Sequence, residues 1–424
     1  MANIKMLAQD YISTEFLSHD LYSLLSREYG PSFFLLNQEK LLSNFHSFSG
    51  SFLSYYPKVE VGYSYKTNYT PRICKLLHDV GAWAEVVSEM EFKAAQRNGI
   101  SPERIIYNGP YKSEDSFREA AFGGSIINLD SQRDLNLLAS ASSFASPQVQ
   151  IKVALRVNFS VSENVSRFGF DVEDPGFKHV LLFIKSLPNV HLAGLHCHFP
   201  DRDLDSFRIR AENLISLCRL LFSDHPPDLL NIGGGFFSEL PESLRASMTI
   251  NPVEFHEYAR VIGSILSEAF PSVESCPTLY LEPGTALVAN VLTFYTQVLS
   301  TKSVRNKNFA TVAGSIFDIS PNAKVKNLPV KLILDPRLTR KASRGFSIVG
   351  FTCIEGDVLT ENLDASLEPG DVLAYGNVGS YSIVMRPPFI LPSSPMLTFN
   401  SGKNSFELIK IKQADSSVFD LFLE

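Results

Sequence analysis

The sequence predicts an α/β fold: a (β/α)8 barrel of the TIM type with a second, C-terminal β-sheet or β-barrel domain. Two observations lead to this prediction. From about residue 59 to residue 282, short apolar runs alternate with longer amphipathic segments, the pattern of parallel strands covered by helices. After residue 288 the pattern changes to strand-like runs divided by Asp, Gly and Pro turns. We expect the barrel over residues 37–288 and the β domain over residues 1–36 plus 289–424.

The expected barrel strands are eight apolar, β-branched runs of buried-strand length. They cover residues 59–65, 83–87, 104–107, 125–129, 150–157, 190–196, 228–232 and 278–281. Between them, apolar residues recur three or four positions apart, for example within residues 72–77 and 214–221, as in helices. Eight repeats of strand then helix are what a closed barrel requires.

The expected strands of the β domain are shorter and more scattered. They cover residues 292–299, 330–334, 372–375, 382–385 and 406–411. Residues 33–36 form a short apolar run before the barrel, and we expect them to join the same sheet. A chain of 424 residues with 45% hydrophobic content exceeds one compact core, which agrees with two domains.

Composition argues against several classes of partner. The formal net charge is −7 and the Lys and Arg residues are scattered, so nucleic acid and anionic membranes are not expected partners and a small molecule is. No apolar run reaches the roughly 18 residues of a membrane span, and residues 1–30 lack a signal-peptide pattern, so we expect a cytoplasmic protein. The five cysteines are widely spaced without a C-x-x-C pair, which indicates neither a disulfide framework nor structural zinc.

Polar and glycine residues follow the predicted barrel strands where each strand ends. They are Lys66, Ser88, Asn108, Asp130, Asn158, His198, Gly233, Gly234, Gly235 and Glu282. The carboxyl ends of barrel strands converge, and barrel enzymes keep their chemistry there. The sequence therefore predicts one active site at this end of the barrel.

Lys66 is the first candidate for chemistry in that site. It ends a run predicted to be a buried strand, where lysine rarely lies without a partner or a role. Burial favours the neutral amine, the form that attacks an aldehyde to make an imine. The alternative is a lysine that extends out of the barrel mouth into solvent.

Two further motifs suit a phosphorylated aldehyde cofactor. Gly233, Gly234 and Gly235 would let backbone amides approach an anion, although a glycine run also serves as a simple sharp turn. Glu282 could hold a pyridine nitrogen protonated, or it could be a solvated loop residue.

His196 and His198 alternate along their strand, so we expect both imidazoles on one side. Two imidazoles could bind a metal, which makes a metal-dependent barrel hydrolase a competing hypothesis. Zinc needs three or four ligands, however, and the remaining histidines do not follow predicted strands, so we expect no metal site. We favour a histidine lying flat against a planar cofactor ring.

Taken in order, these motifs resemble the fold-type III pyridoxal-phosphate (PLP) decarboxylases that act on diaminopimelate, ornithine and arginine. The resemblance covers nearly the whole chain. Its motifs are Tyr65-Lys66-Thr67-Asn68, Glu85-Val86-Val87-Ser88, Asn108-Gly109-Pro110-Tyr111-Lys112, Asn128-Leu129-Asp130-Ser131, Arg167-Phe168-Gly169, Gly194-Leu195-His196-Cys197-His198, Gly233-Gly234-Gly235, Glu282-Pro283-Gly284, Cys353 to Asp357 and Gly379-Ser380-Tyr381.

The resemblance implies a role for each matching residue. Lys66 would form the Schiff base with PLP, and His198 would stack on the ring. Glu282 would pair with the ring nitrogen, and the three glycines with Tyr381 would hold the phosphate. Cys353 would return a proton from the partner subunit of a homodimer with shared active sites, which the β domain completes. The implied reaction is decarboxylation of an amino acid through a quinonoid intermediate to the amine and CO2.

This chain departs from the family pattern at the phosphate site. Asp201 lies close to the position where relatives have a phosphate-binding serine, and Thr285 replaces an arginine after the Glu-Pro-Gly motif. Arg202 is a candidate for the missing positive charge.

A third departure concerns the substrate. Relatives that take diamines or diaminopimelate have an acid directly after the cysteine, whereas this chain has Ile354 and then Glu355. On a strand, one residue turns the side chain to the opposite face. We therefore expect free ornithine, lysine and diaminopimelate to be poor substrates. This feature resembles the family branch that works on larger or carboxylate-bearing amino acids, or amino-acid conjugates, in siderophore or antibiotic assembly.

Two other classes remain open. Fold-type III racemases share a lysine-bound cofactor on a barrel but use a tyrosine as second base. Decarboxylase relatives that have lost catalysis and only bind partners also exist, although Lys66, Glu282, Cys353 and Tyr381 are all retained here.

Overall fold

The computed structural model describes residues 11, 16–163, 165–246, 248, 251–320, 325–340 and 344–422. The chain divides into two compact units. The barrel unit comprises Leu42–Glu239 and Met248–Leu287, and the β unit comprises Met1–Leu41, Leu240–Ser247 and Val288–Glu424. Residues 1–10 and 12–15 of the predicted 1–36 segment lie outside the described residues. The boundaries of the barrel domain expected at residues 37 and 288 remain a prediction.

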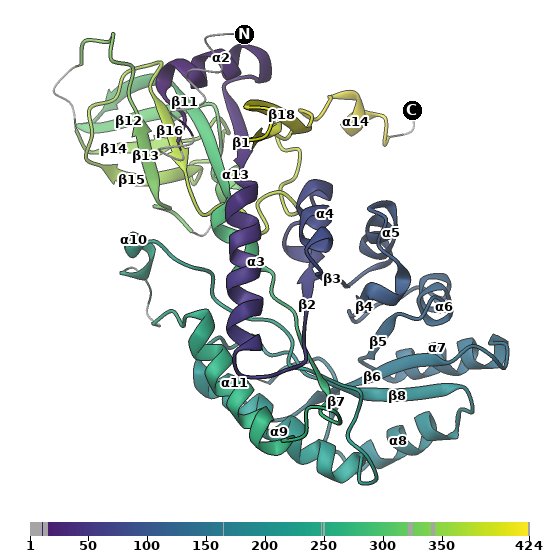
Figure 1. Ribbon diagram of the computed structural model, residues 1–424. Helices are drawn as coiled ribbons and strands as arrows, with labels where there is room; N and C mark the ends of the chain where they lie inside the picture. Colours follow the sequence, from purple (N-terminus) through teal and green to yellow (C-terminus); the bar gives the residue numbers. More distant parts are fainter. Residues whose placement is uncertain are drawn as a thin grey trace. The chain divides into compact units, whose positions relative to one another are not determined.

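Eight parallel strands form a closed barrel, as predicted (Figure 1). They are β2 (Val59–Ser64), β3 (Trp83–Val86), β4 (Ile105–Tyr107), β5 (Ile126–Leu129), β6 (Ile151–Asn158), β8 (Val190–His196), β9 (Leu229–Asn231) and β10 (Thr278–Leu281). Each strand pairs in parallel with its neighbours, and the barrel closes where β10 pairs with β2. All eight predicted runs are confirmed, and no end differs by more than one residue.

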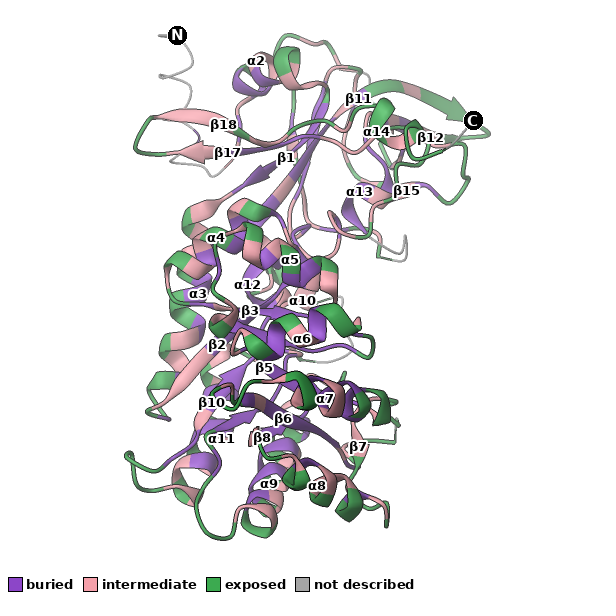
Figure 2. Ribbon diagram, turned by 90° about the vertical axis from the view of Figure 1, so that its right-hand side faces the viewer, coloured by how far each residue is buried: buried purple, intermediate pink, exposed green. Residues whose placement is uncertain are grey.

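Helices follow the strands of the barrel. They are α4 (Pro71–Asp79), α5 (Glu89–Arg97), α6 (Glu114–Phe122), α7 (Gln132–Phe144), α8 (Phe177–Ser186), α9 (Leu204–Leu221) and α11 (Phe255–Ala269). Figure 2 shows the barrel strands largely buried, while the helices each carry an exposed face. This pattern explains the apolar strand runs and the amphipathic helices of the sequence.

The remaining short elements connect this framework. They are η1 (Tyr65–Thr67), η2 (Pro102–Arg104), β7 (Phe170–Asp171), α10 (Glu242–Arg245), α12 (Thr285–Val288) and η3 (Ala289–Val291). The longer α3 (Gln38–Leu53) precedes the first barrel strand. Among the described residues, no helix is both long enough and apolar enough to cross a membrane.

The β unit contains a mixed sheet of nine strands. They are β1 (Ser32–Leu36), β11 (Leu292–Val304), β12 (Lys307–Val312), β13 (Val330–Ile333), β14 (Phe346–Val349), β15 (Val358–Leu363), β16 (Val372–Tyr375), β17 (Met396–Asn400) and β18 (Ser405–Lys410). As predicted, β1 joins this sheet, between β11 and β17. The unit also carries α2 (His19–Tyr29), α13 (Ile316–Ile319) and α14 (Ser416–Phe419).

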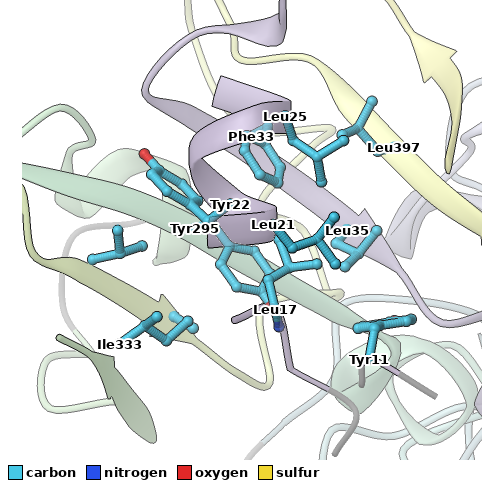
Figure 3. Close-up of a cluster of buried hydrophobic side chains, with 12 residues drawn as sticks. Tyr11, Leu17, Leu21, Tyr22, Leu25, Phe33, Leu35, Tyr295, Ile333 and Leu397 are labelled. Carbon is cyan, nitrogen blue, oxygen red and sulfur yellow. The ribbon is translucent and has the colours of Figure 1, made fainter. Parts of the chain in front are cut away.

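An aromatic core joins β1, β11 and α2 in the β unit (Figure 3). Tyr22 stacks on Phe33 with ring centroids 5.6 Å apart, and Phe33 stacks on Tyr295 at 5.5 Å. All three side chains are buried. Their burial explains why the N-terminal apolar run is part of the C-terminal sheet.

One predicted strand of the β unit is wrong. Residues 382–385 form a turn in which Ser382 Oγ donates to the Val378 carbonyl and the Met385 N–H donates to the Tyr381 carbonyl. These local hydrogen bonds replace sheet pairing. The sequence analysis also missed β12, β14, β15 and β17. Lys, Asn, Thr and Glu interrupt the apolar pattern of β12 and β15, whereas β14 and β17 are only four and five residues long.

A buried ion pair links the loop between β4 and α6 to the first turn of α7. Lys112 Nζ lies 3.0 Å from Asp134 Oδ2 and donates to the Gly109 carbonyl at 2.7 Å. Neither charged side chain is exposed. Burial lowers the pKa of Lys112 and raises the pKa of Asp134, so each charge depends on its partner.

Replacing Lys112 with methionine is expected to reduce the free energy of unfolding by roughly 3 to 5 kcal/mol, because it leaves the Asp134 charge buried without its cation. Urea unfolding followed by circular dichroism measures this loss. The double variant Lys112→Met with Asp134→Leu removes both charges and should recover part of it. A single variant as stable as the double variant would contradict this account.

Candidate active site

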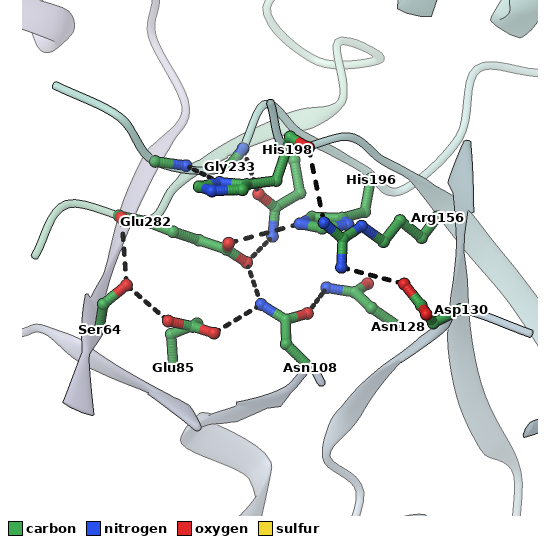
Figure 4. Close-up of polar contacts among 12 residues, drawn as sticks. Ser64, Glu85, Asn108, Asn128, Asp130, Arg156, His196, His198, Gly233 and Glu282 are labelled. Atoms are coloured by element: carbon green, nitrogen blue, oxygen red, sulfur yellow. Dashed lines mark hydrogen bonds and ion pairs between the residues drawn. The ribbon is translucent and has the colours of Figure 1, made fainter. Parts of the chain in front are cut away.

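The carboxyl ends of the barrel strands bring together a ring of polar side chains (Figure 4). The ring draws residues from six strands and from the loops that follow them. Its members are Ser64, Lys66, Glu85, Asn108, Asn128, Asp130, Arg156, His196, His198, Asn231, Gly233, Gly234 and Glu282. The strand-end residues of the sequence analysis therefore meet in this ring or, for Gly235, in the glycine turn that continues from it, with two exceptions.

The exceptions are Ser88 and Asn158, whose side chains serve local structure. Ser88 is the N-cap of α5, where its hydroxyl accepts the backbone N–H of Glu91 at 3.2 Å. Asn158 donates to the carbonyls of Ser166 and Phe168, each at 2.7 Å. Both contacts satisfy backbone groups that the end of a helix or a loop leaves unpaired.

Lys66 lies in η1, directly after the predicted strand. Its Nζ is 2.6 Å from Glu85 Oε2, and 36% of its side-chain surface is exposed. The expectation of a deeply buried amine is therefore wrong, because η1 lifts the residue to the rim of the barrel. An opposite charge at this distance favours the ammonium form of lysine.

Glu282 is the buried carboxylate at the centre of the ring. Its Oε1 accepts hydrogen bonds from Asn108 and Asn231, each at 2.8 Å, and its Oε2 lies 3.3 Å from His196 Nε2. Burial opposes ionisation, but His196, Lys66 and Asn108 together hold the pKa of Glu282 below its ordinary value. Glu282 is consequently an ionised carboxylate inside the barrel, which excludes the reading of a solvated loop residue.

His198 follows β8 and contacts the glycine turn. Its Nδ1 accepts the backbone N–H of Gly234 at 2.9 Å, so the ring is neutral with its proton on Nε2. Burial and the neighbouring Lys66 hold the pKa of His198 well below its usual range. A neutral imidazole is therefore present at neutral pH.

His196 has a different environment from His198, although only two positions separate them. It is the last residue of β8 and its Nε2 faces Glu282, while its Nδ1 is buried without a hydrogen-bond partner among the described residues. Within the residues that the structure describes, no group of three or more His, Cys, Asp or Glu side chains is placed to hold a metal ion.

The glycine turn requires glycine at two positions because the backbone approaches other chain segments closely. A Cβ atom on Gly233, which has φ +74°, would lie 2.5 Å from the Cys197 carbonyl oxygen. A Cβ atom on Gly234 would lie 2.3 Å from the Glu282 carbonyl oxygen. The turn therefore lies directly against the loops that carry His198 and Glu282.

Comparison of the sequence with protein families shows the family of this chain. A family model described as pyridoxal-dependent decarboxylase, pyridoxal binding domain, matches residues 42–289, which is more than half of the chain. The chain belongs to this family. This decarboxylase is accordingly a PLP-dependent carboxy-lyase that acts on an amino acid, and the resemblance noted from its motifs is confirmed.

Curated relatives of this decarboxylase align over most of its length. It is 29% identical over 380 residues to a probable chloroplastic diaminopimelate decarboxylase of Oryza sativa subsp. japonica, a match that covers 84% of this chain and 74% of the rice protein. It is 26% identical over 383 residues to a diaminopimelate decarboxylase of Aquifex aeolicus, covering 85% and 84% of the two chains.

Solved structures share the fold of this decarboxylase. Diaminopimelate decarboxylase from Helicobacter pylori, complexed with L-lysine, superposes with a TM-score of 0.78 at 22% identity and covers 94% of this chain and 98% of its own. The arginine decarboxylase of Paramecium bursaria Chlorella virus gives a TM-score of 0.70 at 19% identity, with 88% and 97% covered. Both confirm the predicted barrel with a separate β domain.

The barrel residues of this decarboxylase fit PLP. The glycine turn leaves the backbone N–H groups of Gly235 and Phe236 without an acceptor in the described chain, so they are available to an anion. An ionised carboxylate has about four acceptor positions, and three are used on Glu282. A cationic ring nitrogen can take the fourth.

Several ring residues of the decarboxylase were not assigned a role from the sequence. They are Ser64, Glu85, Asn128, Arg156 and Asn231. Arg156 Nη1 lies 3.0 Å from Asp130 Oδ1, and its Nη2 donates to the His198 carbonyl at 3.5 Å. All five interrupt apolar strand runs with a polar side chain, which is the signal that could have found them.

The other predicted site residues lie in the β unit. Cys353, Ile354 and Glu355 are exposed, in a bend and turn between β14 and β15. The buried carboxylate of Asp357 holds this loop by accepting the Ile316 N–H at 2.7 Å and the Thr352 hydroxyl at 2.7 Å. The segment is not a strand, so the expected placement of Ile354 and Glu355 on opposite faces of a strand is wrong.

Tyr381 also belongs to the β unit and has a left-handed backbone, with φ +64°. It follows Gly379, whose N–H donates to the Ala289 carbonyl at 2.9 Å and at which a Cβ atom would lie 1.7 Å from the Val288 carbonyl oxygen. Such a backbone is uncommon for a residue with a bulky side chain and is concentrated at functional sites.

Glu91, on α5, has an unusual pKa for a residue outside the ring. Its Oε2 accepts the Val87 N–H at 2.8 Å, and burial raises its pKa from 4.5 to about 7. The folded chain thus keeps a proton that the unfolded chain loses between pH 4.5 and pH 7. The free energy of unfolding should therefore fall as pH rises through this interval.

Replacing Glu91 with glutamine keeps a side-chain oxygen that can accept the Val87 N–H and removes the carboxyl group that ionises. We expect this variant to be more stable than the wild type by roughly 1 to 3 kcal/mol at pH 8, with a smaller difference at pH 5. Urea unfolding at the two pH values measures the difference. Glu89→Gln, on the same helix but partly exposed, is the matched control and should leave the pH dependence in place. Parallel profiles for the wild type and Glu91→Gln would exclude this assignment.

Proposed function

We propose that this enzyme decarboxylates an amino acid or an amino-acid conjugate, with PLP held at the ring of strand ends and linked to Lys66. The observation that carries the proposal is the buried, ionised Glu282, held by two asparagines and a histidine in the same ring as Lys66. A carboxylate so placed suits a protonated pyridine nitrogen. The chemistry that PLP supplies when bound is an electron sink for the electron pair left by departing CO2.

The residues of this chain would then divide the work. Glu282 would hold the proton at the pyridine nitrogen, and His198, unprotonated at Nδ1, would stack on the cofactor ring. The N–H groups of the glycine turn would bind the phosphate, and we propose the same role for Tyr381. Asn108 and Asn231 keep the Glu282 carboxylate in place, so that binding does not require the site to reorganise.

We further propose that Cys353 returns the proton to the product, reaching the site from the partner subunit of a homodimer. Its exposure supports this role, since a thiol that serves another subunit has to be accessible. Such an enzyme would act in the cytoplasm, and its monomer would be inactive.

The turn between β14 and β15 bears on which substrate side chain the enzyme accepts. Ile354 stands in place of the acid after the cysteine, and it is 42% exposed. An apolar residue there supports a larger amino acid or a conjugate, as in siderophore or antibiotic assembly, rather than a free diamino acid. The names of the relatives support diaminopimelate instead, and Glu355, exposed in the same turn, provides a carboxylate for a distal ammonium group.

A substrate panel tests the proposal. The PLP-loaded enzyme is incubated with diaminopimelate, lysine, ornithine, arginine and acylated or carboxylate-bearing derivatives of them, and CO2 and the matching amine are measured. We expect CO2 release to be fastest with a derivative. Turnover of diaminopimelate above all derivatives would overturn the substrate assignment, and exchange at Cα without CO2 would indicate a racemase. Neither signal with any compound would indicate a binding protein.

A further inference from the structure

Arg210 is a fully buried cation beside the glycine turn. It lies on α9 with none of its surface exposed, and no carboxylate of the described chain is within ion-pair distance of it. A buried charge without a counter-ion is costly, so it is retained only where the surroundings compensate it. Arg210 therefore needs an explanation that hydrophobic packing does not provide.

The guanidinium of Arg210 binds backbone carbonyls of two loops at the barrel mouth. Its Nη1 donates to Gly234 O at 3.0 Å, and its Nη2 donates to Phe199 O at 3.1 Å and to the Asp201 carbonyl. Its Nε donates to Ser206 Oγ at 3.1 Å. Four of its five N–H groups are thus used, all on neutral acceptors, while the carboxylates of Asp201 and Asp203 attract the charge only from beyond ion-pair distance.

These contacts orient the peptide groups of the turn. In a trans peptide the C=O and the following N–H point in opposite directions. Because the Gly234 carbonyl faces Arg210, the N–H of Gly235 faces away from it, and this N–H has no acceptor within the described residues. Arg210 itself stays close to the turn, since a Cβ atom on Gly235 would lie 3.9 Å from its Nη1.

The other cations near this turn have carboxylate partners, since Arg156 pairs with Asp130 at 3.0 Å and Lys66 pairs with Glu85 at 2.6 Å. The Arg202 guanidinium lies over the Phe237 ring, 5.4 Å from its centroid. The Asp201 carboxylate accepts the Ser162 hydroxyl at 3.3 Å, so only its main-chain carbonyl contacts Arg210. His198 is neutral, and Thr285 carries no charge.

We infer that Arg210 provides the positive charge of the phosphate-binding turn, in place of the serine and arginine that this chain lacks. It acts as a positioning residue, by aiming the N–H groups of the turn at the phosphate, and as a buried charge that favours a dianion. A phosphate ester carries about −1.5 to −2 charges at neutral pH, which suits a buried cation without an ion-pair partner in the described chain. The inference rests on the proposed binding of PLP at Gly233, Gly234 and Gly235.

The test compares PLP with pyridoxal, which has the same aldehyde and ring but no phosphate. Apo-protein is titrated with each compound, and binding is followed by the visible absorbance of the bound form. The ratio of the two dissociation constants isolates the phosphate contribution. Arg210→Met should reduce the preference for PLP by roughly 10- to 100-fold, the usual value of hydrogen bonds to a charged group.

Two variants sharpen the comparison. Arg210→Lys keeps the charge but loses the forked contacts to two loops, so it should retain an intermediate preference for PLP. Arg202→Met removes the neighbouring arginine and is the matched control, which should keep the wild-type preference. Circular dichroism and thermal unfolding establish that each variant is folded before titration.

Each outcome has a distinct meaning. Equal weakening of PLP and pyridoxal in Arg210→Met, or an unchanged preference, would overturn the inference. A loss of preference in Arg202→Met instead would assign the charge to Arg202. If neither Arg210 variant folds with PLP present, the residue is structural and the inference fails. A wild-type protein that binds neither compound would instead refute the proposed function itself.

Discussion

Replacing Lys66 with alanine is expected to abolish the covalent link to PLP and to lower decarboxylation on the order of 10⁴-fold or more. Lys66 is the amine of the ring that lies at the barrel rim, beside Glu85 and accessible to a ligand. Its loss removes the nucleophile rather than weakening a contact. Borohydride treatment followed by mass spectrometry should find a pyridoxyl group on Lys66 in the wild type and none in the variant, and CO2 release measures the activity.

Lys75→Ala is the matched control for this prediction. Lys75 lies on α4, the helix that follows η1, and pairs with Asp79 at 3.0 Å on the barrel surface. Its removal should change neither the labelling nor the rate. A Lys66→Ala enzyme that keeps the yellow colour and the reduced pyridoxyl group would show that another lysine holds the cofactor.

Replacing Glu282 with glutamine is expected to lower turnover by about 10³-fold while leaving PLP bound, since it removes a preorganised charge from the reacting ring system. The amide cannot hold the pyridine nitrogen protonated. It also presents an NH2 group where Asn108, Asn231 and His196 now face oxygen atoms. Steady-state CO2 release gives the turnover, and PLP titration gives the affinity.

The controls separate charge from size. Glu212→Gln, an exposed glutamate on α9 that pairs with Arg208, should leave turnover unchanged. Glu282→Asp retains the charge and should recover part of the lost activity despite its shorter side chain. Full activity in Glu282→Gln would exclude the proposed pairing with the ring nitrogen, and with it the observation on which the proposed function depends.

The barrel could be predicted from the sequence because its strands are buried on both faces. In such strands nearly every residue is apolar, so each run contrasts with the amphipathic helix that follows it. The β unit lacks this contrast. In β15, for example, Glu361 and Asn362 are exposed, and the polar segment gives no strand signal.

The site was predicted only in part. The prediction used one rule, that the functional residues of a barrel directly follow the carboxyl ends of its strands. That rule found Lys66, Asn108, His198 and Glu282, which do meet in the ring. It could not find Arg210, which lies on the second turn of a helix and reaches the site only through tertiary packing. No sequence pattern distinguishes such a side chain from an ordinary exposed arginine.

Strand β1 and its partners are made at very different times during translation. The apolar strand β1 leaves the ribosome early, yet its partners β11 and β17 begin only at Leu292 and Met396, after the whole barrel. At roughly 5 to 20 residues per second, Phe33 to Leu36 wait on the order of ten to fifty seconds for β11. During that time the nascent segment is a template for aberrant pairing, so it needs protection until translation of β11 is complete.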